Sequence, residues 1–529
     1  MMLRIPLILS LLFLVSPSTP AQEVVKKFPE TPQAVEAGKK LYMKRCWFCH
    51  GREGKGNGPV AEYLYPRPRD FTLGQYKFRT TPSGEPPTDE DLFRTITRGI
   101  PGTAMPAWNT LKEEERWQLV YFIKTFSENP WPRPGPQPVK FGKEPSRSDE
   151  LIKKGQEVFK KAKCWECHGD TGRGEGPSAP TLKDDLGFPI KAFDLTKSWL
   201  YKGGNSSRDI FTRFSTGVDG TPMPSFADTL SDEERWALAY YVESIQSPDV
   251  PGADVIIKAH RVEGELPTDP DAPAWQKAKP LVIPLSGQVL VKPRWQIPSV
   301  DTVVIRALFN EKSIAFLIVW DDPFKDTVHQ PSPAEGKPEY QSTYVKIDPE
   351  KLRAEPLRDA IALQFPVRIP EGPERPHFFR GDPGRPVVLW EWRADWNEDK
   401  NRKTAVEVYN AQGFKKPYLP LPPESQEVMG KGVWEKGQWK VVMIRPLEPR
   451  DKGKEITFAR GRLIPLAVQV WDGSNGERDL LMALSSWNFL LIPRPTPIGV
   501  YLSSFIGLAA VGGLEWLLVR NVRKKSFSP

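Results

Sequence analysis

The chain has 529 residues, of which 39% are hydrophobic and 26% are charged, enough apolar sequence to build several globular domains. Its net charge of +8 comes from 74 basic and 66 acidic residues spread along the chain, which excludes the concentrated basic stripe of a nucleic-acid-binding protein. The 56 prolines follow no repeat period, so they indicate ordered turns and extended linkers, not a collagen-like or disordered chain.

The N-terminal segment has the pattern of a secretory signal peptide. Arg4 is followed by the apolar run Ile5–Val15 and by small residues that end at Ala21. The apolar run is too short to span a membrane comfortably. We therefore expect residues 1–21 to be a signal peptide and the segment that follows to lie outside the cytoplasm.

All four cysteines fall in two copies of one motif. Cys46–His50 reads Cys-Trp-Phe-Cys-His and Cys164–His168 reads Cys-Trp-Glu-Cys-His, the attachment pattern of a c-type haem. A zinc half-site or a redox dithiol would not explain a histidine directly after both pairs of cysteines. Two covalent haem c groups are expected, with thioethers at Cys46, Cys49, Cys164 and Cys167 and iron ligation by His50 and His168.

A methionine in a repeated context supplies a second iron ligand for each motif. Met105 lies in Gly102–Pro106 and Met223 lies in Gly220–Pro224, and both segments read Gly-Thr-x-Met-Pro. Each methionine follows its motif histidine by 55 residues. A methionine is more often a core residue, but the repetition of context and spacing favours iron ligation. Because His/Met ligation is typical of electron-transfer cytochromes, the chain is predicted to carry electrons.

The sequence around the first motif predicts two helices and a loop. A helix is expected over Pro32–Arg45, and the glycines of Gly54–Pro59 predict an irregular loop after the motif. Thr110–Glu113 reads as a capping box that begins a helix ending near Phe126. The residues expected on the buried face of that helix are Trp117, Val120 and Tyr121.

The second unit repeats this plan about 118 residues later. A helix over residues 155–163 precedes the motif, a glycine-rich loop follows it, and Ser231–Glu234 caps the last helix. The residues expected on its buried face are Trp236, Ala239 and Tyr240. This pattern indicates an internal duplication. The proline-rich residues 129–147 between the units predict an extended linker.

Each unit resembles a class I cytochrome c, over residues 32–128 and 148–248. The resemblance implies two all-α domains. It also implies that the backbone carbonyls of Pro59 and Pro177 accept hydrogen bonds from the free ring nitrogens of His50 and His168, which orients the ligands and tunes their basicity.

From about residue 255 the sequence changes to short runs of β-branched and aromatic residues. Val303–Phe309 and Ser313–Trp320 are separated by Asn310–Lys312, which predicts a hairpin. Further predicted strands are Ala360–Phe365, Val387–Trp392, Ala405–Tyr409, Trp439–Ile444 and Leu466–Trp471. Since no long helical period appears, an all-β sandwich is expected over residues 255–495.

Four segments of this region resemble the haem-binding domain of ethylbenzene dehydrogenase-type γ subunits: Val319–Asp322, Ala360–Pro366, Gly381–Trp392 and Val470–Arg478. The resemblance covers about residues 300–492. Such domains accompany molybdenum enzymes of the dimethyl-sulfoxide-reductase superfamily, including nitrate reductases, selenate reductases and nitrite oxidoreductases. It therefore implies molybdenum and iron–sulfur subunits as partners.

The same resemblance suggests a haem b in the β domain, because members of the family bind one with a methionine and a lysine as iron ligands. Neither expected ligand stands in the corresponding segments, which here contain His377 and Met482. Both residue types can ligate iron. The alternative, which we favour slightly, is that His377 is a polar loop residue and Met482 fills the core.

The C-terminal segment predicts a membrane anchor. Ile498–Val519 is largely apolar and, as a helix, long enough for one crossing. Basic residues follow at Arg520, Arg523, Lys524 and Lys525. The positive-inside rule then puts residues 520–529 in the cytoplasm and the haem domains on the periplasmic side of the inner membrane.

Taken together, the sequence predicts a membrane-anchored dihaem cytochrome subunit, without catalytic activity of its own. It would relay electrons between a molybdenum/iron–sulfur oxidoreductase and another cytochrome or respiratory complex. A dihaem peroxidase-like enzyme is a second interpretation, but it needs an open iron position that a methionine would close. A third is a cytochrome whose sandwich binds a ligand such as carbohydrate without haem b, on a surface formed by Trp390, Trp392 and Trp434.

Overall fold

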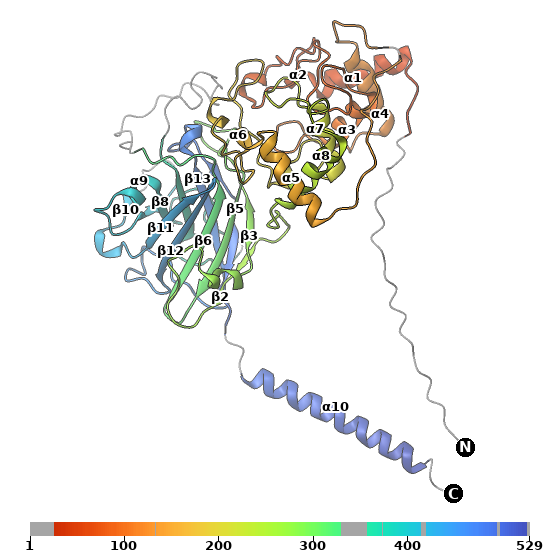
Figure 1. Ribbon diagram of the computed structural model, residues 1–529. Helices are drawn as coiled ribbons and strands as arrows, with labels where there is room; N and C mark the ends of the chain where they lie inside the picture. The colour runs from red at the N-terminus through yellow and green to blue at the C-terminus, as the bar shows by residue number, and fades with distance from the viewer. Residues whose placement is uncertain are drawn as a thin grey trace.

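The computed structural model describes residues 26–132, 134–328, 357–372, 374–413, 419–494 and 498–525. Two helical domains lie side by side, a β-sandwich adjoins the second of them, and a long C-terminal helix stands apart (Figure 1). The fold class predicted from the sequence is therefore confirmed. The predicted signal peptide, residues 1–21, lies outside the described residues.

The first helical domain is built around two long helices that cross. Its elements are α1 (Pro32–Arg45), α2 (Trp47–His50), the 3-10 turn η1 (Ala61–Tyr63), α3 (Asp89–Arg98) and α4 (Glu113–Lys124). At the crossing of α1 and α4, a Cβ added to Gly38 would lie 2.0 Å from the carbonyl oxygen of Gln118. Only glycine lets these two backbones approach so closely. The helix predicted over Pro32–Arg45 is confirmed to the residue.

The second helical domain repeats this arrangement. Its elements are α5 (Asp149–Lys161), α6 (Trp165–His168), η2 (Ala179–Thr181), η3 (Ser198–Leu200), α7 (Ser207–Thr216) and α8 (Asp232–Ser244). Gly155 of α5 takes the place of Gly38, since its Cβ would lie 2.0 Å from the carbonyl oxygen of Ala237 on α8. The predicted duplication is thus confirmed in the packing of the helices as well as in their order.

The two predicted capping boxes have different outcomes. Ser231 caps α8, with its hydroxyl accepting from the Glu234 backbone nitrogen and the Glu234 carboxylate accepting in return. The box predicted at Thr110 is wrong. Helix α4 begins at Glu113, and it is the Lys112 backbone nitrogen that donates to the Glu115 carboxylate. The predicted buried faces are confirmed, because Trp117, Val120, Tyr121, Trp236, Ala239 and Tyr240 are all buried.

The C-terminal half is a sandwich of two sheets. The order in the larger sheet is β1 (Ile256–Lys258), β15 (Asn488–Leu491), β13 (Leu463–Trp471), β7 (Ala360–Pro366), β8 (Val387–Arg393), β9 (Val406–Ala411) and β10 (Leu419–Pro420). In addition, β14 (Ala483–Leu484) pairs with β13, and β4 (Ser286–Gly287) pairs with β14. The smaller sheet has the order β11 (Met429–Glu435), β12 (Gln438–Pro446), β6 (Ser313–Asp321), β5 (Thr302–Phe309) and β2 (His260–Arg261), with β3 (Leu281–Pro284) beside β5. Short helical turns lie at η4 (Pro273–Lys277), α9 (Ala394–Glu398), η5 (Pro423–Ser425) and η6 (Gly473–Asn475).

The predicted strands and the hairpin at Asn310–Lys312 are confirmed. Among the strands that the sequence did not predict, β11 is the longest. Its sequence contains Gly430 and Gly432, which weaken a strand pattern. In the fold both glycines face the opposite sheet, where a Cβ would lie 2.2 Å from Val406 and 2.4 Å from the Trp392 ring. Tertiary contact with large side chains therefore requires glycine in this strand.

Aromatic side chains fill the space between the two sheets. Trp320, Trp390, Trp392 and Trp439 are each at most 2% exposed, and Trp434 packs against the same core from its edge. Trp390 and Trp392 therefore cannot form the exposed stacking surface that a carbohydrate-binding interpretation would need.

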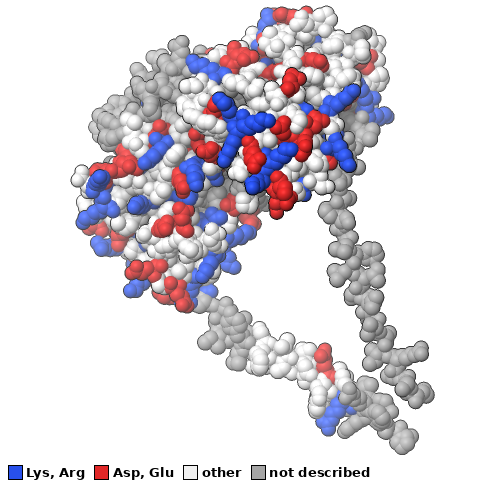
Figure 2. Space-filling view, in the orientation of Figure 1, with Lys and Arg blue, Asp and Glu red and all other residues white. Residues whose placement is uncertain are grey.

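The last helix, α10 (Ile498–Lys525), has no burial against the rest of the chain along its apolar stretch, Ser503–Arg520. This stretch is long and apolar enough to cross a membrane. Figure 2 shows that charged side chains gather near its far end, whereas basic and acidic residues are intermixed over the visible face of the other domains.

Candidate haem sites

The two cysteine motifs form matching single helical turns. In each, the backbone nitrogen of the histidine donates to the carbonyl of the first cysteine, His50 to Cys46 at 3.1 Å and His168 to Cys164 at 2.9 Å. Helical periodicity places residues i, i+3 and i+4 on one face. The two thiols and the imidazole of each motif therefore share one side of the turn.

Each motif histidine is held by a backbone carbonyl. The Nδ1 atom of His50 lies 3.1 Å from the carbonyl oxygen of Arg69, and that of His168 lies 2.8 Å from that of Phe193. Since a carbonyl can only accept, Nδ1 carries the proton in both rings. The expectation that Pro59 and Pro177 supply these carbonyls is wrong.

A local turn after each carbonyl explains this difference. Asp70 Oδ1 accepts hydrogen bonds from the backbone nitrogen and hydroxyl of Thr72, which stiffens the chain directly after Arg69. Asp194 does the same for Thr196 after Phe193. The Asp-x-Thr pattern that follows both carbonyl residues is the signal in the sequence that marks these positions.

The electrostatic environment suits a neutral imidazole and protonated thiols. Burial lowers the pKa of His50 and His168 below the ordinary value. A neutral ring with a proton on Nδ1 leaves the Nε2 lone pair free for a metal. Burial raises the pKa of the Cys46 and Cys164 thiols to about 12, which disfavours the thiolates that zinc binding and disulfide exchange require.

The two methionines are presented by identical loops. The hydroxyl of Thr103 donates to the Ile100 carbonyl and accepts from the Met105 backbone nitrogen. Thr221 makes the same pair of bonds around Met223. This scheme gives a structural reason for the repeated Gly-Thr-x-Met-Pro sequence. It also shows that the two methionine positions are equivalent in the two domains.

The residues present fit a c-type haem in each domain. Each offers two thiols and an imidazole on one short helix and a thioether on a separate loop, which is the donor set of a covalently held, six-coordinate haem. In the structure the eight predicted residues belong to two equivalent groups: Cys46, Cys49, His50 and Met105 in one domain, and Cys164, Cys167, His168 and Met223 in the other.

The methionine loops lie where the two helical domains meet. A Cβ at Gly102 would lie 3.5 Å from the side chain of Leu200 in the second domain. In return, Asp219, four residues before Met223, accepts from the Arg79 guanidinium of the first domain at 2.8 Å. Both methionine-bearing loops therefore border the same interface.

The residues considered for haem b are not arranged for it. Met482 is fully buried in a small apolar core with Phe379 and Leu389. The Nδ1 atom of His377 accepts a hydrogen bond from the Phe379 backbone nitrogen at 3.1 Å. Met482 thus fills the core, and His377 shapes its own loop, so these two residues do not fit a haem b.

Comparison with known proteins assigns a family to each of the three domains. Residues 33–123 match the model of cytochrome c oxidase, cbb3-type, subunit III, residues 152–246 match that of cytochrome c, and residues 272–418 match that of ethylbenzene dehydrogenase. The chain thus combines two cytochrome c domains with an ethylbenzene dehydrogenase-type domain.

Individual relatives cover parts of the chain. The chlorate reductase subunit gamma of Ideonella dechloratans is 27% identical over 45% of this chain and 84% of its own length. A protein of Haloferax mediterranei described as a respiratory nitrate reductase haem subunit is 25% identical over 47% of this chain and 78% of its own. A chain of the Kuenenia stuttgartiensis reducing HAO-like protein complex is 49% identical, covers 40% of this chain and 96% of its own, and has a TM-score of 0.38.

Proposed function

We propose that this chain, with two cytochrome c domains and an ethylbenzene dehydrogenase-type domain, is the membrane-anchored electron-transfer subunit of an oxidoreductase complex. It relays electrons between a molybdenum/iron–sulfur enzyme on the periplasmic side, similar to nitrate reductases or nitrite oxidoreductases, and a cytochrome or respiratory complex. The observation that carries the proposal is the repeated donor set, with both methionine loops at one interface. The relatives named for nitrate and chlorate reductases support the class of partner.

In each cytochrome domain the chain's own residues have distinct tasks. The cysteines hold the porphyrin covalently, the histidine and methionine ligate iron, and the carbonyls of Arg69 and Phe193 keep the proton on Nδ1 of the histidines. A haem with these ligands supplies reversible one-electron transfer and leaves no open iron position for catalysis. The chain is therefore proposed to carry electrons without transforming a substrate.

The β domain is proposed to dock the partner enzyme without a haem b. Residues 272–418 match the ethylbenzene dehydrogenase family, but Met482 lies in an apolar core and His377 accepts from the Phe379 backbone nitrogen. Docking of the partner enzyme requires a protein surface and does not require a haem in this domain.

The C-terminal helix is proposed to tether the complex to the membrane. Residues 498–519 would cross the bilayer once, and the basic residues 520–529 would lie in the cytoplasm. The haem domains would then lie on the periplasmic side. The apolar, fully exposed stretch Ser503–Arg520 supports this arrangement.

A quantitative pyridine haemochrome of the purified full chain tests this proposal, because it distinguishes c-type from b-type haem. We expect two haem c and no haem b per chain, and one haem c in the double variant Cys164→Ala/Cys167→Ala. Fewer than two haem c in the unsubstituted chain would refute the electron-relay proposal. A third haem of b type would refute the assignment of His377 and Met482.

Co-purification tests the partner. A tagged chain isolated in mild detergent from its host should bring down a protein that contains molybdenum and iron–sulfur clusters. Cyanide binding to the reduced protein as rapid as in a five-coordinate haem protein would instead favour a catalytic cytochrome.

A further inference from the structure

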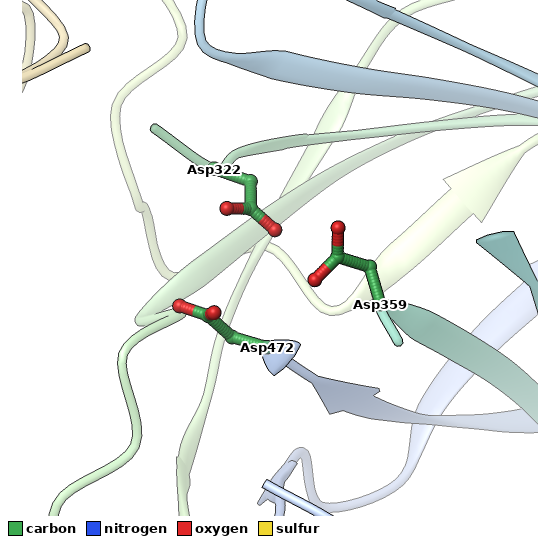
Figure 3. A group of neighbouring side chains, drawn as sticks. All are labelled: Asp322, Asp359 and Asp472. Atoms are coloured by element: carbon green, nitrogen blue, oxygen red, sulfur yellow. The ribbon is translucent and has the colours of Figure 1, made fainter. Parts of the chain in front are cut away.

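Three buried aspartates meet at the end of the sandwich that faces the second cytochrome domain. Asp322 directly follows β6, Asp359 directly precedes β7, and Asp472 directly follows β13. Strand β6 belongs to one sheet, whereas β7 and β13 are neighbours in the other. Figure 3 shows the three carboxylates pointing toward one another. One oxygen from each lies within 4.8 Å of the other two.

The protein orients these carboxylates with its own donors. Asp359 accepts from the backbone nitrogens of Asp326 and Gly473 and from the Trp439 indole, at 2.8 to 2.9 Å. Asp472 accepts from the Ser474 hydroxyl at 2.6 Å. These bonds fix the positions of the carboxylates before any ligand arrives, as a built site requires.

Asp322 is held through one of its two oxygens, because its Oδ1 atom accepts from the Phe324 backbone nitrogen at 3.2 Å. Its side chain is completely buried, and its Oδ2 atom has no hydrogen-bond partner among the described residues. An unpaired carboxylate oxygen in a protein interior loses its solvation, which is strongly unfavourable unless the group is neutralised or coordinated. Because the Asp322 carboxylate points toward the other two (Figure 3), the missing partner belongs in the space that the three share.

The loop after β13, which carries Asp472, packs closely against the segments that carry Asp326 and Asp359. A Cβ at Gly473 would lie 2.3 Å from the Leu357 carbonyl oxygen and 2.8 Å from Cβ of Asp326. Glycine at this position therefore lets the loop after β13 bring Asp472 against the segments that carry Asp326 and Asp359.

Negative charge exceeds positive charge in this region. Asp326 and Glu477 are also buried beside the three aspartates. Lys191 of the second cytochrome domain lies 3.1 Å from the carboxylate of Asp472. With the carboxylates ionised, the site therefore needs additional positive charge.

We propose that Asp322, Asp359 and Asp472 bind one Ca²⁺ ion that joins the two sheets of the sandwich. Ca²⁺ takes oxygen ligands at about 2.4 Å, so two ligands of one ion lie at most about 4.8 Å apart. The three carboxylate oxygens all lie within 4.8 Å of one another, which is compatible with this limit. An all-oxygen site disfavours zinc and copper, which prefer nitrogen and sulfur. Mg²⁺ usually keeps several waters and demands strict octahedral geometry, so it suits this buried site less well.

The ion would also stabilise the contact between the sandwich and the second cytochrome domain. Asp472, one of the proposed ligands, contacts Lys191. Lys191 lies two residues before Phe193, whose carbonyl oxygen accepts from His168. Ca²⁺ would thus stabilise the end of the sandwich on which the second cytochrome domain rests. Nothing in the proposed electron relay depends on this ion.

The test uses the full chain with its haems. The protein is treated with a chelator, dialysed, and titrated with Ca²⁺ or Mg²⁺ by calorimetry, and bound metal is measured by mass spectrometry. We expect one Ca²⁺ per chain, weaker binding of Mg²⁺, and a rise in the melting temperature of the sandwich with Ca²⁺. Asp322→Asn should weaken Ca²⁺ binding by about tenfold or more, because it removes one ligand charge.

The control is Asp399→Asn, which removes an exposed carboxylate of the same domain and should bind Ca²⁺ like the unsubstituted chain. Absence of Ca²⁺ binding and of a Ca²⁺-dependent melting temperature in the unsubstituted chain would overturn the proposal, with the carboxylates then sharing protons. Unchanged affinity in a folded Asp322→Asn protein would overturn it as well. If that variant does not fold, the Ca²⁺ stoichiometry and melting temperature of the unsubstituted chain decide the question alone.

Discussion

The guanidinium of Arg79 lies 2.8 Å from the carboxylate of Asp219 and joins the two cytochrome c domains through a buried ion pair. Arg79 has no exposed side-chain surface, and it also donates to the carbonyl of Thr216 in the second domain. Because Asp219 lies in the loop that presents Met223, this pair ties the first domain to the second domain's methionine loop. The relative position of the two candidate haem sites therefore depends on it.

Arg79→Met should loosen the contact between the cytochrome domains. It leaves Asp219 and the Thr216 carbonyl without their cation, and breaking a buried pair from one side costs about 3–5 kcal/mol. Urea denaturation followed at the haem absorbance measures this loss. The matched control is Lys154→Met, which breaks an exposed pair with Glu233 and should change stability by no more than about 1 kcal/mol. Equal effects of the two substitutions would contradict the role of Arg79.

Met223→Leu should open one iron position. Loss of the thioether lowers the reduction potential of that haem, and the reduced protein should gain cyanide binding at about one site per chain. Potentiometry and cyanide titration check both outcomes, and Met105→Leu should act in the same way on the other haem. Met443→Leu, in the buried core of the sandwich, is the control. Ligand binding that stays absent in both variants would show that the methionines do not ligate iron.

Gly155→Ala should destabilise the second cytochrome domain. The new methyl group would lie 2.0 Å from the Ala237 carbonyl oxygen, so α5 and α8 must separate, at a cost of about 1–3 kcal/mol or more. Circular dichroism during urea unfolding measures the change. Gly135→Ala, in the linker with no atom within 4 Å of its Cβ, should remain within about 0.5 kcal/mol of the unsubstituted chain. A neutral Gly155→Ala would mean that the two helices do not cross at this point.

Lys197→Met should weaken the contact between the second cytochrome domain and the sandwich. Lys197 is buried and lies 2.6 Å from Asp301 and 3.3 Å from Asp321 of the β domain. Burial lowers its pKa, but the surrounding carboxylates outweigh burial and raise the pKa above its ordinary value, so the lysine is charged. Its removal takes the lysine from Asp301 and leaves Asp321 with its ion pair to Arg173, 3.3 Å away, at a cost of about 3–5 kcal/mol.

Limited proteolysis between α8 and β1 provides the measurement for Lys197→Met, because a looser interface exposes this connection. We expect faster cleavage there than in the unsubstituted chain. Lys279→Met, which removes an exposed pair with Asp254, should leave the cleavage rate unchanged. An unchanged rate in Lys197→Met would show that other contacts hold the interface.

Features that depend on neighbouring residues or on exact repetition could be predicted from the amino-acid sequence alone. The Cys-x-x-Cys-His motifs, the 55-residue spacing to Met105 and Met223 and the hairpin at Asn310–Lys312 are all readable without coordinates. Because each of these features is local or occurs twice, it is improbable that the pattern arises by chance. The helix over Pro32–Arg45 is likewise recognisable, from its proline start and from the Thr31 cap that the structure shows.

Contacts between residues far apart in the sequence became visible only in the tertiary structure. The carbonyl of Arg69 reaches His50, Lys191 reaches Asp472 in another domain, and Gly430 and Gly432 of β11 accommodate side chains of the opposite sheet. The convergence of three aspartates from both sheets has no trace in local periodicity. Each of these contacts depends on how separately stable elements pack, and packing joins residues whose sequence separation carries no information about their distance in space.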